Sequence, residues 1–374
     1  MNRVMRLTST YRRTGMTVLG MAIPALLLGQ VPDTTHAVTL TGSVTSSYTY
    51  SSRGTDHVIV GRLYGRRHDE FMLNVANLTL DRAGPTDRAG AGFHVEGFVG
   101  QNAAVVKSTG LDLGPSADIW QAYVVLNLPL KRADHTLQFK LGKMATLLGV
   151  EVGEDVLNPN LDVGSQDIFL EPFTETGLEL DAKLGAKADF EFRVSNGWDQ
   201  VTDVNSAKSV TARLGLTPDS RTLIAVTGYT GPEQVDNSHS QRSGLNLVVT
   251  RKLSGTTWVA GQGDLGREAD IGPAGKNAGW SAMGVWLTHD LSSATTIALR
   301  GDVMNDRDGV RTSGVLGYPV NGGQKVSSIT ATLNIKHWDH ALVRPEVRYD
   351  HSTLAVFAGH REQMSFAFGL SYLF

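Results

Sequence analysis

Apolar and polar residues alternate along most of the chain with a period of two, which is the period of a β-strand. The pattern is clearest in the C-terminal segment 364–374. One face of this segment is small and polar, and consists of Ser, Ala and Gly. The other face is strongly apolar: Phe366, Phe368, Leu370, Tyr372 and Phe374. An apolar face of this kind meets a second sheet in a soluble sandwich, but in an outer-membrane barrel it meets lipid while the other face lines a wet lumen.

Segments with this alternation recur along the chain and predict an all-β fold, a transmembrane antiparallel β-barrel of about 16 strands. Most are longer than the about 5–6 residues of a globular strand and suit tilted membrane strands of about 9–11 residues. Two segments are ambiguous in phase, and in 280–288 the even-numbered residues compete with the odd-numbered ones for the lipid face. The predicted strands are 38–51, 70–81, 91–105, 118–130, 136–148, 174–185, 188–199, 207–217, 222–230, 243–253, 256–266, 279–290, 294–306, 325–336, 341–351 and 363–374.

The connections between the predicted strands alternate between short and long, which is typical of short periplasmic turns and long outer loops. The pattern has exceptions, a medium link at 82–90 and short loops at 200–206 and 352–362. With sixteen strands, both ends of the barrel chain are expected on the short-turn side. Aromatic residues near strand ends predict two interfacial girdles. The outer girdle would hold Tyr48, Tyr50, Trp198, Tyr229 and Tyr349, and the inner one Trp258, Trp338, Tyr372 and Phe374.

The first residues are typical of an export signal. Four arginines precede an apolar run from Met16 to Leu28, which is too short to span a bilayer but suits the apolar region of a signal peptide. A small residue suitable for cleavage stands at Ala37. We therefore expect residues 1–37 to be a signal peptide and 38–374 to be the barrel, in the bacterial outer membrane. The alternative is a short N-terminal helix of a cytosolic protein.

Composition and motifs argue against several other classes of protein. The chain has 374 residues and no cysteine, which excludes a disulfide scaffold, a cysteine nucleophile and a thiolate metal site. The formal net charge of −3 provides no basic excess for nucleic acid. No His-x-x-x-His or His-Glu-x-x-His spacing, nucleophile elbow or phosphate loop is present. We therefore expect no enzymatic activity, no metal and no cofactor.

The long connection 149–173 is the most informative loop, because it is too long for a plain hairpin link and carries no Lys or Arg. It follows the fifth predicted strand, and in this position it resembles the loop of general porins that narrows the lumen. Acidic groups in a narrow channel create a negative potential that the low-dielectric wall focuses. The alternative is a solvated outer loop near lipopolysaccharide. The candidate constriction residues are Glu151, Glu154, Asp155, Asp162, Asp167 and Glu171.

Basic residues in the inward phase of several strands are the candidate counterpart of this loop. Facing the acidic loop, they would create a transverse field across the pore. In the alternative interpretation they pair with neighbours such as Glu191, Asp302 and Glu346 and simply neutralise the lumen. The candidate wall residues are Lys140, Arg193, Arg213, Arg300, Arg344 and Arg348.

Three stretches resemble the β-barrel porin-2 (OmpL-like) family. They are Leu141–Glu151 with Asn158–Asn160, Pro172–Gly177, and Asn196–Asp199 with Asp203–Asn205. The resemblance implies an outer-membrane porin that lets small hydrophilic solutes diffuse passively through a water-filled, charge-lined lumen. It also implies contact with the lipid bilayer and lipopolysaccharide, and a homo-oligomer is an open possibility.

The terminal Phe374 resembles the C-terminal aromatic residue that the barrel-assembly machinery reads in outer-membrane proteins. Two other functions stay open at this point. One is a structural or adhesive barrel with a plugged lumen and loop-mediated contacts. The other is a transporter of hydrophobic substrates, which usually has an N-terminal plug.

Overall fold

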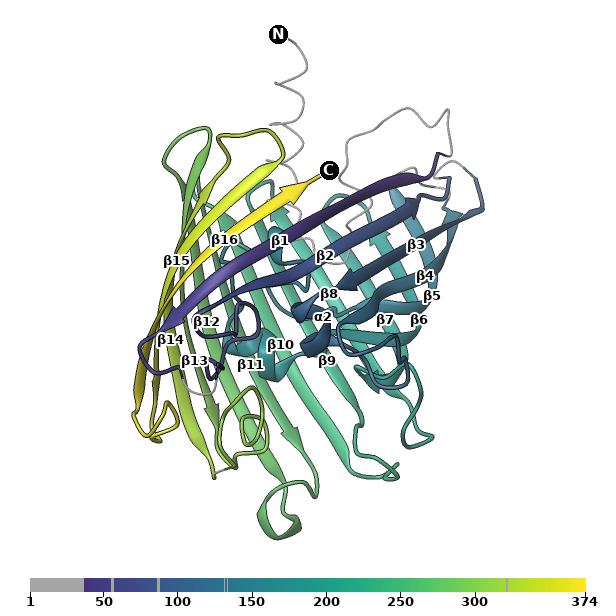
Figure 1. Ribbon diagram of the computed structural model, residues 1–374. Helices are drawn as coiled ribbons and strands as arrows, with labels where there is room; N and C mark the ends of the chain where they lie inside the picture. The colour runs from purple at the N-terminus through teal and green to yellow at the C-terminus, as the bar shows by residue number, and fades with distance from the viewer. Residues whose placement is uncertain (1–36, 55–56, 86–87, 131, 133, 321) are drawn as a thin grey trace.

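The fold is a closed barrel of sixteen antiparallel strands (Figure 1). The structure is a computed structural model, and it describes residues 37–54, 57–85, 88–130, 132, 134–320 and 322–374. The expected signal peptide lies outside the described residues, apart from Ala37. The strands are β1 (Thr39–Ser51), β2 (Glu70–Arg82), β3 (Gly90–Val99), β4 (Ala117–Pro129), β5 (His135–Ala145), β6 (Thr174–Leu184), β7 (Ala188–Trp198), β8 (Ser209–Asp219), β9 (Thr222–Pro232), β10 (Gln241–Lys252), β11 (Thr257–Glu268), β12 (Ala278–Asp290), β13 (Thr295–Asp306), β14 (Gln324–Ile335), β15 (Ala341–Ser352) and β16 (Glu362–Leu373).

Every strand pairs with its neighbours in sequence, and β1 pairs with β16 to close the barrel. At this seam Tyr48 lies opposite Phe368. Beyond the last ladder pair, Gly42 and Phe374 each donate a backbone N–H to the other's carbonyl at 3.1 Å. Closure leaves no sheet edge among the described strands, so the backbone polar groups of the wall can be satisfied inside hydrocarbon. The prediction of a sixteen-stranded barrel is confirmed.

The alternation of side chains matches the closed barrel. On β16 the outward Phe366, Phe368 and Tyr372 are each about half exposed (51%, 52% and 52%), whereas the inward Ser365 and Ser371 are at most 1% exposed. The lumen-facing side chains are therefore buried by the contents of the lumen, whereas the lipid-facing side chains are exposed. The ambiguous phase of β12 is also settled. The even-numbered residues, Trp280 to Trp286, face the lumen, and Met283 and Val285 face outward.

Three details of the sequence prediction are wrong. Residues 101–105 do not continue the third predicted strand, because Gly100 adopts a left-handed φ of 132° and precedes the short helix α2 (Gln101–Val106). Trp198 and Tyr229 do not belong to an outer girdle, because both are only 8% exposed and pack against each other inside the barrel. Trp258 packs inward as well. The outward-facing aromatic residues Tyr50, Tyr349, Trp338, Tyr372 and Phe374 remain exposed at strand ends.

The connections differ strongly between the two ends of the barrel (Figure 1). Short turns lie at the end where β1 starts and β16 ends, which is the top of the figure. No helix in the described part of the chain is long and apolar enough to cross a membrane, a test that does not bear on β-barrels. The loops at the opposite end are L1 (52–69), L2 (100–116), L3 (146–173), L4 (199–208), L5 (233–240), L6 (269–277), L7 (307–323) and L8 (353–361).

The C-terminal ring contributes to the seam, and this generates a prediction about assembly. A Cβ placed on Gly42 would lie 2.7 Å from the Phe374 ring, so the ring covers this glycine on the lipid-facing side. Deleting Phe374 removes both seam hydrogen bonds and this cover. We expect the deletion to lower the amount of heat-modifiable, folded protein in the outer membrane and to leave aggregates in the periplasm.

The conservative replacement Phe374→Tyr is the matched control, because it keeps the backbone bonds and an aromatic ring. Normal levels of folded protein in the deletion would contradict an assembly role for this residue.

Candidate functional site

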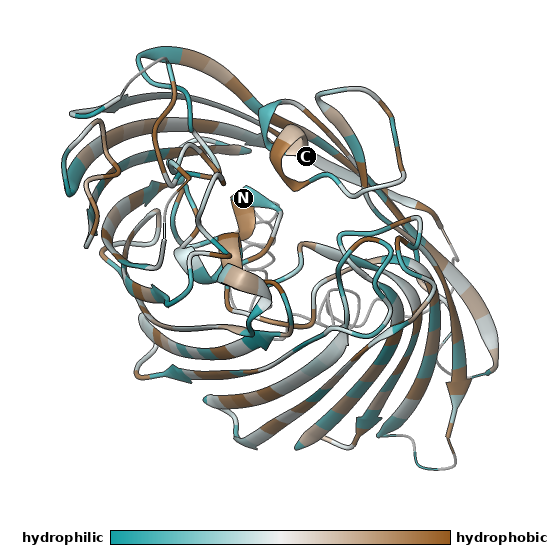
Figure 2. Cartoon of the chain, turned by 90° about the horizontal axis from the view of Figure 1, so that it is seen from below, coloured by the Kyte–Doolittle hydropathy of each residue, from teal (hydrophilic) through white to brown (hydrophobic). Residues whose placement is uncertain are grey.

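Loop L3 folds into the barrel rather than away from it. Figure 2 looks into the barrel from the loop side and shows chain segments filling part of its interior. L3 contains a turn of 3₁₀ helix, η1 (Asp155–Leu157), and a short helix, α3 (Ser165–Leu170). Its two ends lie together, since Thr146 donates its backbone N–H to the Phe173 carbonyl at 3.1 Å. All residues from Asn160 to Phe169 are buried, so the loop lies against the wall and other loops and not in open solvent.

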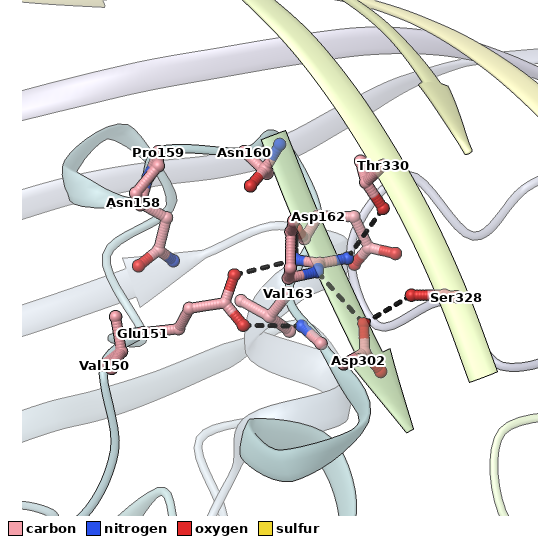
Figure 3. Close-up of polar contacts among 12 residues, drawn as sticks. Val150, Glu151, Asn158, Pro159, Asn160, Asp162, Val163, Asp302, Ser328 and Thr330 are labelled. Carbon is pink, nitrogen blue, oxygen red and sulfur yellow. Dashed lines mark hydrogen bonds and ion pairs between the residues drawn. The ribbon is translucent and has the colours of Figure 1, made fainter. Parts of the chain in front are cut away.

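Strand β13 holds L3 through Arg300. Figure 3 shows Glu151 and Asp162 of the loop and Asp302 of the strand around this contact. The Arg300 guanidinium forms an ion pair with Glu151 at 2.7 Å and also donates to the Asp162 carbonyl at 2.6 Å. The second Glu151 oxygen accepts the backbone N–H of Gly164 at 2.6 Å. Asp302, two residues further along β13, accepts the backbone N–H of Ser165 at 3.2 Å. These contacts fix both the beginning and the middle of L3 to one strand.

Strand β15 and loop L1 hold the middle of L3 through Asp162. One carboxylate oxygen of Asp162 pairs with Arg348 at 2.8 Å and lies 3.4 Å from Arg62 of L1. The other accepts the backbone N–H of Tyr64 at 2.8 Å. Arg62 also pairs with Glu346 of β15 at 2.9 Å. Side chains this deeply buried keep their charges only when each is paired and hydrogen-bonded, so the four charged groups depend on one another.

The tip of L3 reaches a wall far from β13. Gly153 packs against Trp120 of β4, since a Cβ on this glycine would lie 2.0 Å from the indole ring. Its carbonyl accepts the Tyr64 hydroxyl at 2.8 Å. Next along the loop, Glu154 accepts the side-chain amide of Gln121, also of β4, at 3.4 Å. Because β4 and β13 lie on nearly opposite sides of the sixteen-stranded ring, L3 crosses the lumen.

The remaining acidic candidates behave differently from Glu151 and Asp162. Asp155 is held near β15, because its carbonyl accepts Arg344 at 2.8 Å. Asp167 and Glu171 form no ion pair with a described residue. Burial, together with neighbouring carboxylates, raises the pKa of both well above its usual value. Burial and the facing carboxylate of Glu96 raise the pKa of Glu154 in the same way. Three of the six carboxyls therefore keep their protons to a higher pH than an ordinary carboxyl does.

The basic candidates divide into two groups. Arg300, Arg344 and Arg348 contact L3 directly, as described above. The structure does not bring the other three to the loop's carboxylates, because they pair along the wall formed by β5 to β8. Their ion pairs are Lys140 with Glu179 at 2.8 Å, Arg193 with Glu175 at 2.9 Å, and Arg213 with Glu191 at 2.8 Å.

Loops also place an apolar cluster inside the loop-side half of the barrel, which the sequence analysis did not anticipate. L1, L3, L7 and L8 contribute Tyr64, Phe169, Tyr318 and Phe357, and all four side chains are buried. Tyr318 contacts both Phe169 and Phe357, with ring centroids 5.9 and 6.2 Å apart. The sequence signal that could have identified L1 is its glycine-flanked run from Gly61 to Gly65, where both glycines have positive φ. Such turns let a loop reverse direction in a confined space.

The stretches that resemble a known family hold the C-terminal end of L3 and a turn inside the loop. Asp199 accepts the backbone N–H groups of Phe173 and Thr174, both at 2.9 Å. The Asn158 side chain accepts the Val152 N–H at 2.8 Å and donates to the Val152 carbonyl at 2.6 Å. The resemblance therefore concerns residues that shape the loop.

The Asp162 network generates a prediction about the stability of L3. The change Asp162→Asn removes the negative charge shared by Arg348 and Arg62 and leaves two buried cations less well compensated. Loss of one partner from a buried ion pair costs roughly 3–5 kcal/mol. We expect faster proteolysis within residues 146–173 and a lower unfolding temperature in detergent.

The control is Asp308→Asn, because Asp308 pairs at 2.9 Å with Arg307, whose side chain is 66% exposed. Exposed pairs contribute at most about 1 kcal/mol, so this variant should behave as the wild type. Equal resistance of L3 in both variants would show that the Asp162 network does not hold the loop.

Comparisons with known proteins agree with this architecture. The channel DcaP of Acinetobacter baumannii has a TM-score of 0.61 and 15% identity, over 90% of this chain and 97% of that one. The anion-selective porin of Comamonas acidovorans has a TM-score of 0.64 and 12% identity, over 90% and 99%. OmpF of Salmonella typhi, in complex with daunomycin, has a TM-score of 0.61 and 10% identity, over 90% and 97%. At these identities the likeness shows the fold.

No curated protein sequence matches the chain. A family model described as "Putative beta-barrel porin-2, OmpL-like" matches residues 37–374, which include all sixteen strands of the barrel. The chain therefore belongs to this family of outer-membrane β-barrel porins.

Proposed function

We propose that this porin lets small hydrophilic solutes diffuse passively across the outer membrane through a water-filled lumen that L3 narrows. The observation that carries the proposal is the course of L3 from β13 to β4 across the barrel, with both walls in contact. A loop tied to opposite walls sets the width of the passage and resists displacement by solvent. The narrow passage then excludes large solutes without any conformational change of the protein.

The charged wall of β5 to β8 supports a polar passage. Lys140 is paired with both Glu179 and Asp181, at 2.8 and 3.2 Å. Further along the same wall, Arg213 pairs with Glu191. Alternating charges of this kind stay hydrated or paired and offer no continuous apolar surface for lipid-like substrates. They favour passage of polar solutes over hydrophobic ones.

A barrel with a plugged lumen is the second candidate function, because the apolar cluster of L1, L3, L7 and L8 occupies the loop-side half. Loop contacts with another surface would then be the function. Contacts with lipopolysaccharide, the barrel-assembly machinery or further copies of the chain are compatible with either candidate, and both place the loops outside the cell.

Planar-bilayer recordings distinguish the two candidates. We expect the purified protein to produce discrete conductance steps in potassium chloride, smaller than those of a porin with an unobstructed lumen. The matched variant Asp162→Asn should show larger or noisier steps, because its L3 is less firmly held. A well-folded, heat-modifiable protein that produces no steps in either form would overturn the diffusion proposal and favour the plugged barrel.

The shifted carboxyls of L3 predict that ion selectivity depends on pH. Burial raises the pKa of Glu154, Asp167 and Glu171, so these groups are neutral at low pH and become charged as the pH rises through their shifted values. Negative charge in the lumen favours cations. We therefore expect the cation-to-anion permeability ratio, measured from reversal potentials at low salt, to increase as the pH rises through these shifted pKa values.

The triple variant Glu154→Gln, Asp167→Asn, Glu171→Gln should flatten this dependence and shift selectivity toward anions at high pH. An exposed carboxyl far from L3 provides the control, in the variant Asp236→Asn of L5. If the triple variant keeps the pH dependence of the wild type, L3 does not control the charge of the passage.

A further inference from the structure

Three aromatic rings lie together on the lumen wall near the loop end of the barrel. They are Trp198 at the end of β7, Tyr229 on β9 and Trp280 on β12, and none is more than 8% exposed. The Trp198 and Tyr229 rings meet edge to face, with centroids 5.0 Å apart. These three residues are called the aromatic floor below. Leu147 and Leu148 of L3 pack against Trp198 and Tyr229, but no step of the proposed diffusion uses the three rings.

Two glycines allow these rings to lie across the strands. In the sheet register, Tyr229 is opposite Gly244 of β10, and Trp280 is opposite Gly266 of β11. A Cβ on Gly244 would lie 2.3 Å from the Tyr229 hydroxyl, and a Cβ on Gly266 would lie 2.1 Å from Nε1 of Trp280. Each ring therefore occupies the space that a neighbouring side chain would need. The result is an aromatic patch on the lumen wall.

Two guanidinium groups stand over the aromatic floor. The Cζ atom of Arg242, on β10, lies 4.7 Å from the centroid of the Trp198 ring. The Cζ atom of Arg311, in L7, lies 5.6 Å from Trp198 and 5.2 Å from Trp280. Both distances are within the range in which a cation is attracted to the face of an aromatic ring. The two cations therefore share one aromatic partner.

Their hydrogen-bonding capacity is largely unused by the protein. Arg242 donates Nε to Glu268 at 2.8 Å, and Arg311 donates Nε to the Phe169 carbonyl at 2.6 Å. No described residue accepts a hydrogen bond from the Nη atoms of either side chain. In contrast, Arg300 and Arg348 use both of their Nη atoms on the loop and the wall. A guanidinium is most stable with a planar oxyanion on these atoms.

The charge around Arg311 favours an anionic ligand. Burial and the neighbouring Arg242 lower the pKa of Arg311 to about 10, so it is still charged at neutral pH but poorly compensated. The nearby Asp306 uses one oxygen to accept the backbone N–H groups of Arg311 and Thr312, at 3.0 and 2.8 Å. Glu268 is engaged by Arg242 and by Gln234. These carboxylates therefore balance part of the local charge without occupying the free Nη atoms.

We propose that Arg242 and Arg311, with the aromatic floor, form a binding site for small aromatic monocarboxylates at the outer mouth of the pore. The carboxylate would accept hydrogen bonds from the free Nη atoms, and the ligand ring would stack on the guanidinium groups, which the aromatic floor supports from the other side. An inorganic phosphate would accept the hydrogen bonds of the guanidinium groups but has no ring for the aromatic contact. This inference names a solute class and thus rests on the proposed diffusion function.

Benzoate is the probe, and binding is measured first without conduction. In detergent, saturation-transfer NMR on the folded protein should detect benzoate. It should not detect benzamide, which has the same ring without the charge, to a comparable degree. Arg311→Gln should weaken benzoate binding by about tenfold to hundredfold, as expected for a charge-assisted bond. Arg311→Lys, which keeps the charge but not the planar fork, should weaken it less.

The control Arg307→Gln removes the same charge from the same loop, at an exposed position. It should bind benzoate as the wild type does, and all variants should remain heat-modifiable. Equal binding by wild type and Arg311→Gln would overturn the site. So would equal competition by benzoate and inorganic phosphate, because the floor would then contribute nothing.

Bilayer recordings separate this inference from the proposed function. Benzoate added on the loop side should reduce chloride current through the wild type and not through Arg311→Gln. Benzoate binding without any conductance would overturn the diffusion proposal and leave the site standing. Conductance that benzoate does not affect, together with no NMR signal, would overturn the site and leave the diffusion proposal standing.

Discussion

A β-sheet in hydrocarbon cannot leave a strand edge unpaired, because each exposed N–H or carbonyl would lose its hydrogen bond to water without a replacement. In this chain the seam between β1 and β16 meets that requirement. Closure has a second effect. One face of every strand must be apolar toward lipid, so the charged residues of the strands collect in the lumen. They lie closer together there than they would on the solvent-exposed face of an open sheet. The interior is therefore organised by the need to pair charges.

This pairing explains why a loop fills the barrel. Arg300 and Arg348 project from neighbouring parts of the wall into a confined space, and L3 supplies Glu151 and Asp162 to them. The loop gains fixed partners and the wall gains compensated cations. On the wall of β5 to β8, where L3 supplies no carboxylate, strand residues such as Glu179 and Glu191 take that role. The lumen thus has two sides. On one side the wall cations pair with carboxylates of L3, and on the other they pair with carboxylates of the strands.

Much of the fold could be predicted from the sequence, because a period of two is a local property. The sixteen strands and the face of β16 follow from neighbouring residues alone. The inward orientation of the Trp198 side chain could not be predicted. Gly197, just before it, has a φ of 127° and breaks the alternation of inward and outward side chains. The partners of L3 were equally hidden. Arg348 could be assigned an inward phase, but its choice of Asp162 over other carboxylates depends on packing with Arg62, far away in sequence.

The adjacent ends of L3 have a consequence for how such pores diversify. Thr146 and Phe173 are hydrogen-bonded neighbours, and Gly149 leaves room for the Glu171 carboxylate, since a Cβ there would lie 2.1 Å from it. The segment between them is thus an insert whose two attachment points coincide, joined to strands that pair without its help. Exchange of this insert between related barrels would change the bore and charge of the channel while the lipid-facing wall and its assembly stayed the same. Selection can in this way act on permeability as a separable trait.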